Sequence, residues 1–227
     1  MHSLIELPTN TLLDKFGSGK HAPGSGSAAA LMGLLAAKLV VTVGALTLRK
    51  PEYRKDHAVV QFVCQKIEIE ITPMLMNLFQ QDAECFDEVI KARKARDAAT
   101  DERERRRLGE AALEALKPAT EIPFQIGEAC LKLIDHAVVV FDGGFKGARG
   151  DTGAAVSAAV AGAMSAVFVI NLNLRSFRGS AWAKEQRTRC DSLHESLTTK
   201  QATALERVMQ LRSEDVTSIG LNFGATE

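Results

Sequence analysis

Asp82 is the residue whose type and position in the sequence point most directly to chemistry. It lies in the segment MLMNLFQQDAECFDEVIKA, in which an apolar stripe at helical spacing contains Leu75, Leu78, Phe79, Cys85, Phe86, Val89 and Ile90. Asp82 falls in this stripe, where a hydrophobic residue is expected. A carboxylate there loses hydration, its pKa rises unless it is paired, and such groups are typical of active sites. The alternative is a structural hydrogen bond to a neighbouring helix.

Asp87 differs from Asp82 in its expected surroundings. It falls beside Ala83, Glu84 and Lys91, and the lysine lies four residues further along, which is the spacing of a solvated ion pair on a helix surface. We therefore expect acid–base chemistry from Asp82 and none from Asp87.

The stretch FGSGKHAPGSGSAAALMG concentrates glycine directly before a long apolar segment. Glycine-rich loops that open helices often bind phosphates, but both phosphate motifs fail here. A Walker loop needs Ser or Thr after its lysine, and a histidine follows Lys20. A dinucleotide loop needs a buried strand before its glycines, and no strand is expected before Gly24. The simplest interpretation is a tight turn in which Ser25 or Ser27 caps the helix.

Other polar residues are weaker candidates for chemistry. Lys50 and Tyr53 lie in the link after the first apolar segment, where a lysine usually faces solvent. His21 lies in the glycine-rich loop and can act as an acid or base near neutral pH. Asp151 is explained most simply as a helix N-cap. The cysteines and the remaining histidines lack metal-ligand spacing, so no metal site is expected.

The composition argues against several classes of function. Hydrophobic residues make up 46% of the 227 residues, which allows a sizeable core. Lys plus Arg and Asp plus Glu number 28 each, and one Trp and one Tyr are available for base stacking, so no nucleic-acid partner is expected. The N-terminus lacks the pattern of a signal peptide and the four cysteines are scattered, which favours a cytoplasmic protein.

Almost every long segment has helical periodicity, which predicts an all-α, mainly antiparallel bundle formed by a single domain over residues 1–227. The expected helices cover 3–16, 27–48, 53–96 with a kink at Pro73, 100–116, 121–140, 151–174 and 178–213. The segment IEIEI at 67–71 is ambiguous between helix and strand.

The segments 27–48 and 151–174 lack a polar face. The second is long enough to span a membrane, but its small residues at spacing four and the polar Asn171 and Asn173 favour a helix buried at the centre of the bundle, so no membrane partner is expected. Each segment begins at a glycine-rich loop, and two converging helix N-termini would make an anion site. A chain of this size does not fully bury both helices, so we expect a homodimer or a higher homo-oligomer.

Four motifs follow one another in a recognisable order: APGSGSAAALMG, ALTLRKPEY, DAECFDEV and GDTGAAVSAAVAGAMSAVFVINLN. They resemble the formiminotransferase-cyclodeaminase C-terminal domain family, whose motifs are P-G-G-G-S/A, N-L-T-x-G-K-K-x-Y, D-x-x-A-F-D and S-D-x-G. Each motif alone is weak, but four in register over nearly the whole chain are specific. The resemblance implies an all-helical, dimeric or higher assembly with a tetrahydrofolate derivative as substrate and no tightly bound cofactor.

The resemblance also implies roles for individual residues. Those implied for substrate binding are Pro23, Gly24, Ser25, Gly26, Ser27, Tyr53, Phe86, Asp151, Gly153 and Asn173, and those implied for catalysis are Asp82 as the acid–base group and Lys50 as its cationic partner. The sequence departs from the family motifs at Ser25, Ala45, Arg49, Pro51, Glu52 and Val169. Asn is usual at positions 45 and 169, and its loss affects activity if those side chains hold the pterin or the attacking water.

Members of the family act on one-carbon units at N5 and N10 of tetrahydrofolate. One branch opens the methenyl bridge of 5,10-methenyltetrahydrofolate with water to give 10-formyltetrahydrofolate. The other branch closes formiminotetrahydrofolate and releases ammonia. The resemblance implies the first reaction, in which a buried carboxylate can deprotonate the water. The alternatives are the cyclodeaminase reaction and a diverged member that binds a folate-like ligand without turnover.

Overall fold

The structure is a computed structural model that describes residues 3–211. Every element in this range is helical, which confirms the all-α prediction. The α-helices are α1 (Thr9–Phe16), α2 (Ser25–Leu48), α3 (His57–Lys66), α4 (Thr72–Ala98), α5 (Glu102–Leu116), α6 (Pro118–Gly143), α7 (Arg149–Leu174) and α8 (Ala181–Gln210). Short 3₁₀ segments cover Leu4–Glu6, Pro51–Tyr53 and Lys146–Ala148, and a π-helical turn covers Ile67–Ile71. The expected end of the last helix, near Ser213, lies outside the described residues.

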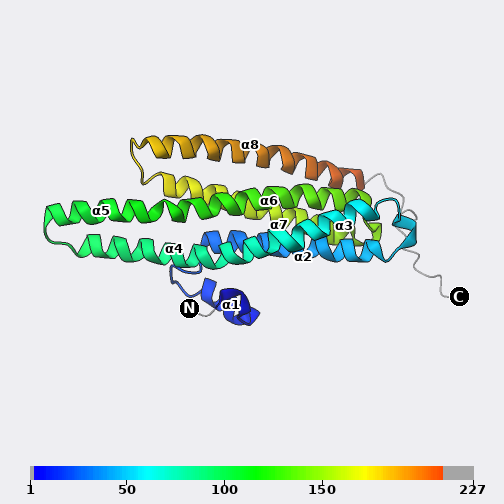
Figure 1. Cartoon of the computed structure of the whole chain (residues 1–227), viewed down its shortest axis with the longest axis horizontal. Helices are drawn as coiled ribbons and strands as arrows, with labels where there is room; N and C mark the ends of the chain where they lie inside the picture. Colours follow the sequence, from blue (N-terminus) through cyan, green and yellow to red (C-terminus); the bar gives the residue numbers. More distant parts are fainter. Residues whose placement is uncertain (1–2, 212–227) are drawn as a thin grey trace.

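Helices α2, α6 and α7 form the centre of the bundle (Figure 1). They meet where Gly162 of α7 faces Ala29 of α2 and Cys130 of α6. A Cβ atom added to Gly162 would lie 2.8 Å from the Cys130 Sγ and 2.9 Å from the Ala29 carbonyl oxygen. Only glycine therefore allows these three helices to approach so closely.

Helices α2 and α7 run antiparallel. The C-terminal end of α7, at Asn173, lies near Gly24 before α2, whereas the Phe145 N–H, just before α7, donates to the Thr47 hydroxyl at the end of α2. The N-termini of α2 and α7 consequently lie at opposite ends of the bundle. The prediction that these two N-termini converge on an anion is therefore wrong.

The chain from α3 to α4 is continuously helical, with the π-helical turn at Ile67–Ile71 between them. The ambiguous IEIEI segment is thus helix. Pro73 follows in the first turn of α4. Because proline has no N–H to donate to the preceding turn, the wider π turn accommodates the lost hydrogen bond at the place where a kink was expected.

Helices α4 and α5 form an antiparallel hairpin that extends beyond the N-terminal end of α2 (Figure 1). Asp101 caps α5, because its carboxylate accepts a hydrogen bond of 2.8 Å from the Glu104 N–H. The predicted solvated face of α5 includes an ion pair of 2.7 Å between Arg107 and Glu104. The hairpin therefore places the end of α4 and the arginines of α5 past the end of the central helix.

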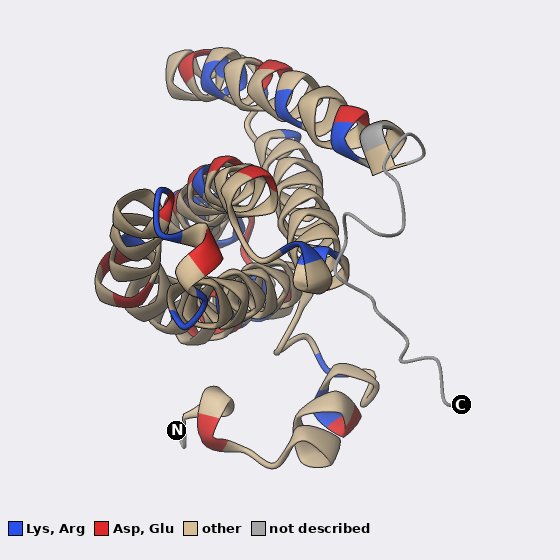
Figure 2. Cartoon of the chain, turned by 90° about the vertical axis from the view of Figure 1, so that its right-hand side faces the viewer, with Lys and Arg blue, Asp and Glu red and all other residues tan. Residues whose placement is uncertain are grey.

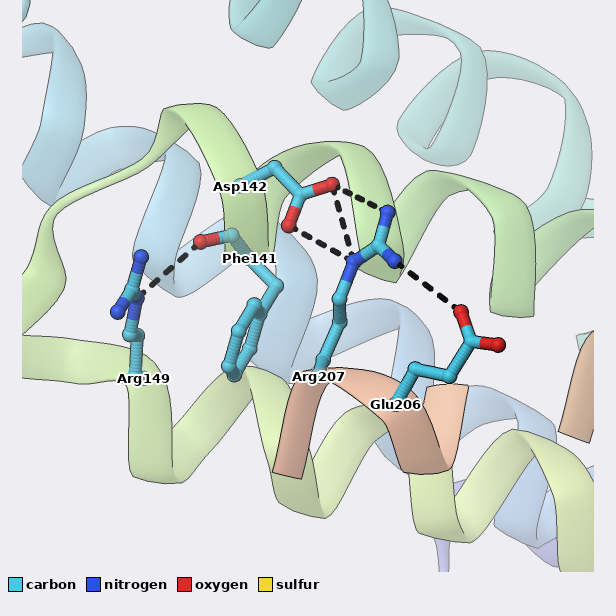
Figure 3. A network of polar contacts seen from close by, with 5 residues as sticks. All are labelled: Phe141, Asp142, Arg149, Glu206 and Arg207. Atoms are coloured by element: carbon cyan, nitrogen blue, oxygen red, sulfur yellow. Dashed lines mark hydrogen bonds and ion pairs between the residues drawn. The ribbon is translucent and has the colours of Figure 1, made fainter. Parts of the chain in front are cut away.

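Helix α8 covers α6 and α7 and is fixed to α6 by ion pairs. Arg189 contacts two glutamates of α6, each at 2.7 Å. Arg207 contacts Asp142 at 2.8 Å, and beside this pair the Arg149 Nε donates to the Phe141 carbonyl (Figure 3). In the end-on view of Figure 2, α8 carries charges of both signs along its length, and α1 lies to one side of the main bundle.

Two segments, α2 and Lys146–Leu174, are long and apolar enough to cross a membrane by length and composition alone. Of the most apolar 18-residue window, 50% is buried in α2 and 33% in Lys146–Leu174. Large apolar side chains of these helices remain exposed at Leu35, Phe168 and Leu172. Both central helices thus contribute to the core with one side and leave apolar residues at the surface on the other.

Candidate active site

The Asp82 side chain projects from α4 toward the first turn of α2 and is 8% exposed. Its Oδ2 accepts two hydrogen bonds from Ser27, one from the backbone N–H at 2.6 Å and one from the hydroxyl at 2.8 Å. Ser27 therefore fixes the carboxylate and does not cap its own helix. Gly24 is the N-cap residue of α2, and no side chain of the described residues caps this helix, so the predicted serine cap is wrong.

Gly26 makes room for the Asp82 carboxylate. A Cβ atom at position 26 would lie 2.0 Å from the Asp82 Oδ1. Any side chain there would force the carboxylate away from Ser27. The second glycine of the PGSGS loop is thus required by close packing and not by phosphate binding.

Burial raises the pKa of the Asp82 carboxyl above its ordinary value, and the two hydrogen bonds from Ser27 only partly oppose this rise. Among the described residues no donor is bonded to Oδ1. One carboxylate oxygen is thus held in place while the other is free to accept a proton, which is the arrangement of a general base.

Asp82 lines a cavity of about 390 Å³ between the N-terminal end of α2, α4 and the C-terminal end of α7. The predicted site residues that it brings together are Gly24, Ser25, Gly26, Asp82, Phe86 and Asn173. The Asn173 side chain is oriented by a hydrogen bond of 3.2 Å from its Nδ2 to the Ala119 carbonyl. Pro23 is buried in the loop just before α2, next to these residues.

The cavity also contains residues that were not predicted as part of the site, among them Arg93, Ser176 and His21. His21 was a weak candidate from the sequence. Arg93 lies eleven residues after Asp82, three helical turns along the same face of α4, so the periodicity that singled out Asp82 also pointed to Arg93. Ser176 comes just after α7 and has no comparable signal in the sequence.

The other predicted site residues, Lys50, Tyr53, Asp151 and Gly153, lie at the opposite end of the bundle, where Gly153 lines a separate cavity between α6, α7 and α8. The Lys50 ammonium lies 4.2 Å from the centre of the Phe145 ring, and the Tyr53 hydroxyl accepts a hydrogen bond of 3.1 Å from the Lys146 N–H. Asp151 is in the first turn of α7, whose N-cap residue is Ala148, so the prediction of Asp151 as N-cap is wrong.

Within one chain, Lys50 lies far from Asp82. Ser27, which holds Asp82, and Lys50 are separated by the length of α2, roughly 35 Å at the rise of an α-helix. Lys50 instead contacts Glu52 at 3.7 Å. The predicted pairing of Lys50 with Asp82 is therefore wrong for a single subunit.

The departures from the family motifs lie both at the Asp82 cavity and at the end of the bundle that carries Lys50. Val169 lines the Asp82 cavity, and Ser25 lies in its wall with an exposed side chain. Ala45 is exposed near the end of α2, close in sequence to Arg49, Pro51 and Glu52. In the described part of the chain no group of three or more His, Cys, Asp or Glu side chains is arranged to hold a metal ion.

Comparison with known proteins gives consistent matches. The family profile of formiminotransferase-cyclodeaminase matches residues 8–192. Methenyltetrahydrofolate cyclohydrolase of Methylorubrum extorquens is 34% identical over 176 residues, which are 78% of this chain and 83% of that protein. Formimidoyltransferase-cyclodeaminase of Sus scrofa is 27% identical over 206 residues, which are 91% of this chain and 38% of that longer protein.

A solved structure shares the fold. Formiminotetrahydrofolate cyclodeaminase from Thermotoga maritima superimposes with a TM-score of 0.78 at 20% identity, and the match covers 92% of this chain and 98% of that one. The profile match spans both groups of predicted residues, from the PGSGS loop to the end of α7. The chain therefore belongs to the formiminotransferase-cyclodeaminase family.

Proposed function

We propose that this protein hydrolyses the methenyl bridge of 5,10-methenyltetrahydrofolate to give 10-formyltetrahydrofolate. The observation that carries the proposal is the Asp82 carboxylate at a cavity, with one oxygen fixed by Ser27 and the other without a donor among the described residues. The likeness to a relative named methenyltetrahydrofolate cyclohydrolase supports the choice of substrate.

The chemistry requires one proton acceptor at the reacting carbon. The methenyl carbon of the cationic amidinium is attacked by water, a C–O bond forms, and Asp82 takes one proton of the water. Asp82 then returns this proton to N5 as the C–N5 bond breaks. The hydroxyl proton leaves as the formyl carbonyl forms. A raised pKa suits a carboxylate that must both accept and return a proton.

The cavity walls suit the reacting end of the substrate. Phe86 and Leu172 offer apolar surfaces for a flat pterin ring, while Asn173, oriented through Ala119, offers a polar group at its edge. Val169 stands where the family usually has Asn and has no group that could hydrogen-bond the ring. Asn173 therefore supplies the oriented amide in this wall. We infer that the ring is held by these groups with its methenyl carbon toward Asp82.

The second candidate function is the closure of formiminotetrahydrofolate with release of ammonia. The Sus scrofa and Thermotoga maritima proteins are named for cyclodeaminase activity, which favours this alternative. The same carboxylate would deliver a proton to the leaving ammonia. The structural groups needed for the two reactions therefore overlap.

The two reactions are separated by direct assay of purified protein. Loss of methenyltetrahydrofolate absorbance above the rate in buffer supports the proposal, whereas a rate no faster than buffer contradicts it. Ammonia release from formiminotetrahydrofolate, measured in parallel, would support the second reaction. Tight folate binding by calorimetry without either turnover would identify a member that binds folate but does not transform it.

We also propose that the protein is a homodimer in which each site is completed by both subunits. The exposed apolar side chains of α2 and α7 support a partner on this side of the bundle. With the two-fold axis perpendicular to these helices, the partner's α2 runs antiparallel, so that the end bearing the partner's Lys50 and Tyr53 approaches Asp82. This pairing would bring Asp82 of one subunit close to Lys50 and Tyr53 of the partner subunit.

A cytoplasmic location is part of the same proposal. One relative and one structural neighbour are named as enzymes that act on tetrahydrofolate derivatives, and the chain has an even balance of acidic and basic residues, 28 of each. Purification without detergent as a monodisperse species supports this location. A requirement for detergent would contradict it.

A further inference from the structure

His57 is a titratable residue to which the proposed chemistry gives no role. It is the first residue of α3 and lies half-buried against the C-terminal end of α2. Its Nε2 lies 3.2 Å from the Thr47 carbonyl oxygen and 3.1 Å from the Lys50 carbonyl oxygen. Because a carbonyl oxygen only accepts hydrogen bonds, Nε2 carries the hydrogen and donates it to both. The ring is therefore held by the backbone of two residues.

The two carbonyls belong to the turn where the chain leaves α2. A helix end leaves its last carbonyls without partners inside the helix, and a histidine side chain is one of the groups that can satisfy them. The Lys50 N–H also donates to the Thr47 carbonyl at 3.0 Å, and Lys50 itself is extended, with φ −110° and ψ 110°. His57 thus fixes the point from which the Lys50 side chain leaves the backbone.

The ammonium end of Lys50 is placed by aromatic contacts. It lies 4.2 Å from the centre of the Phe145 ring, and the Tyr53 ring makes a T-shaped contact with the same phenylalanine at 6.1 Å. The Phe145 backbone is in turn bound to α2, because its N–H donates to the Thr47 hydroxyl at 2.8 Å. Both ends of Lys50 are therefore anchored at Thr47, the backbone through His57 and the ammonium through Phe145.

We propose that His57 is a positioning residue: by holding the Lys50 carbonyl, it keeps the Lys50 ammonium over Phe145 and available to Asp82 of the partner subunit. The inference rests on the proposed function and its shared site, because it takes Lys50 to act there. Without the hydrogen bonds from His57 the link after α2 loosens, and the ammonium turns toward Glu52, an exposed carboxylate that already lies 3.7 Å away. His57 acts through Lys50 and neither accepts nor donates a proton in the reaction.

The test compares His57→Leu with His57→Gln. Leucine fills space without a donor, whereas the glutamine amide offers an N–H at a similar reach. His57→Leu should lower kcat for methenyltetrahydrofolate by about 10- to 100-fold with KM nearly unchanged, because the misplaced group acts on the reaction and not on substrate binding. His57→Gln should keep most of the wild-type kcat. A general disturbance of this end would also displace Tyr53 and raise KM.

Two further variants separate positioning from general damage. In the Lys50→Met background, His57→Leu should change the residual kcat by less than about twofold, because residues that act through one contact are not additive. His194→Leu makes the same substitution at an exposed position of α8 and should leave kcat unchanged. Urea unfolding checks that each variant is folded under the assay conditions.

The position of Lys50 is also measured without turnover. Reductive methylation with ¹³C-formaldehyde labels the lysines, and the Lys50 signal is the one missing from Lys50→Arg. In the wild type the ring current of Phe145 should displace this signal, because the ammonium lies over the ring. The displacement should be lost in His57→Leu and retained in His57→Gln and His194→Leu.

The outcomes separate this inference from the proposed function. Wild-type turnover with an unchanged kcat in His57→Leu would overturn the inference and leave the function standing, as would an equal loss of kcat in His57→Gln and His57→Leu. A wild type without turnover would overturn the proposed function, and the Lys50 signal would then decide the inference. An unchanged signal in His57→Leu contradicts the positioning of Lys50 by His57, and loss of the displacement supports it.

Discussion

At Asp82 the two oxygens of one carboxylate have different surroundings. Oδ2 is fixed by the backbone and hydroxyl of Ser27, and Oδ1 lies beside Gly26 with no donor from the described residues. A fully paired carboxylate would be a structural group with a lowered pKa. Burial raises the pKa of the Asp82 carboxyl, and hydrogen bonds to one oxygen alone only partly oppose this rise.

Asp82→Asn should nearly abolish turnover of methenyltetrahydrofolate while leaving the fold intact. The amide keeps the shape of the side chain and can still accept a hydrogen bond from Ser27, but it cannot take a proton from water. Loss of a general base usually costs about 10²–10⁴ in rate. The measurement is kcat/KM beside the wild type, with helicity checked by circular dichroism.

Asp87→Asn is the matched control for this variant. Asp87 lies 3.9 Å from Lys91 on the same helix and is partly exposed, as its spacing predicted. Its loss should change the rate little, because an exposed pair contributes at most about 1 kcal/mol. An active Asp82→Asn protein would exclude Asp82 as the base and leave the family unaffected.

The raised pKa of Asp82 predicts a pH dependence of both activity and stability. The acid limb of kcat/KM should lie above the ordinary aspartate value of 3.8, because the base is protonated below its raised pKa. Between the unfolded and the native pKa the native state binds more protons, so the free energy of unfolding should fall as pH rises through this window. Asp82→Asn should remove that slope, which urea titrations at several pH values would measure.

A nearby positive charge would oppose the rise of the Asp82 pKa. If the partner's Lys50 lies beside Asp82 in a dimer, the acid limb of the residual kcat/KM of Lys50→Met should lie at higher pH than that of the wild type. An unchanged acid limb would mean that no such contact exists in solution.

At the scale of elements, close helix contacts at glycines set the positions of α2, α6 and α7. Gly162→Ala should lower the free energy of unfolding by about 1–3 kcal/mol, because the added Cβ would be 2.8 Å from the Cys130 Sγ and the helices must move apart. Gly153→Ala on the same helix meets no atom within 4 Å and should raise it by up to about 1 kcal/mol, the gain in helix propensity. Urea unfolding of both variants checks the opposite signs.

Helical periodicity was sufficient to predict most elements and the burial of Asp82. It placed α2 and α5 to within a few residues of their observed bounds. It could not predict the partner of Asp82, because Ser27 lies 55 positions away and meets it only through packing of α2 on α4. It also could not show that Lys50 and Asp82 lie at opposite ends of the bundle, since the direction of each helix depends on tertiary packing.

At the scale of the whole molecule, the proposed dimer would explain why Lys50 and Tyr53 lie at the opposite end of the bundle from Asp82. Asp82→Asn and Lys50→Met should each be nearly inactive alone. When the two variants are unfolded together and refolded, half of the dimers contain one chain of each kind, and each mixed dimer has one intact site and one doubly altered site. The mixture should recover about one quarter of wild-type activity, as expected for sites shared across a two-fold interface.

No recovery of activity in the mixture would show that each site is contained within one chain. The control is Asp82→Asn refolded alone by the same procedure, which should remain inactive. Light scattering on the wild-type protein at micromolar concentration provides a separate check. A well-folded monomer that turns over substrate would contradict the shared site.

The contact between Gly26 and Asp82 also affects how other sequences can be compared with this one. A side chain is accommodated at position 25, where Ser25 is exposed, but none is accommodated at position 26, where a Cβ would lie 2.0 Å from the carboxylate. The residue aligned with Gly26 can therefore be used to decide which related sequences can form the same aspartate site. A chain that aligns with this one but carries any other residue there cannot hold its aspartate in the same orientation, however similar the rest of its sequence.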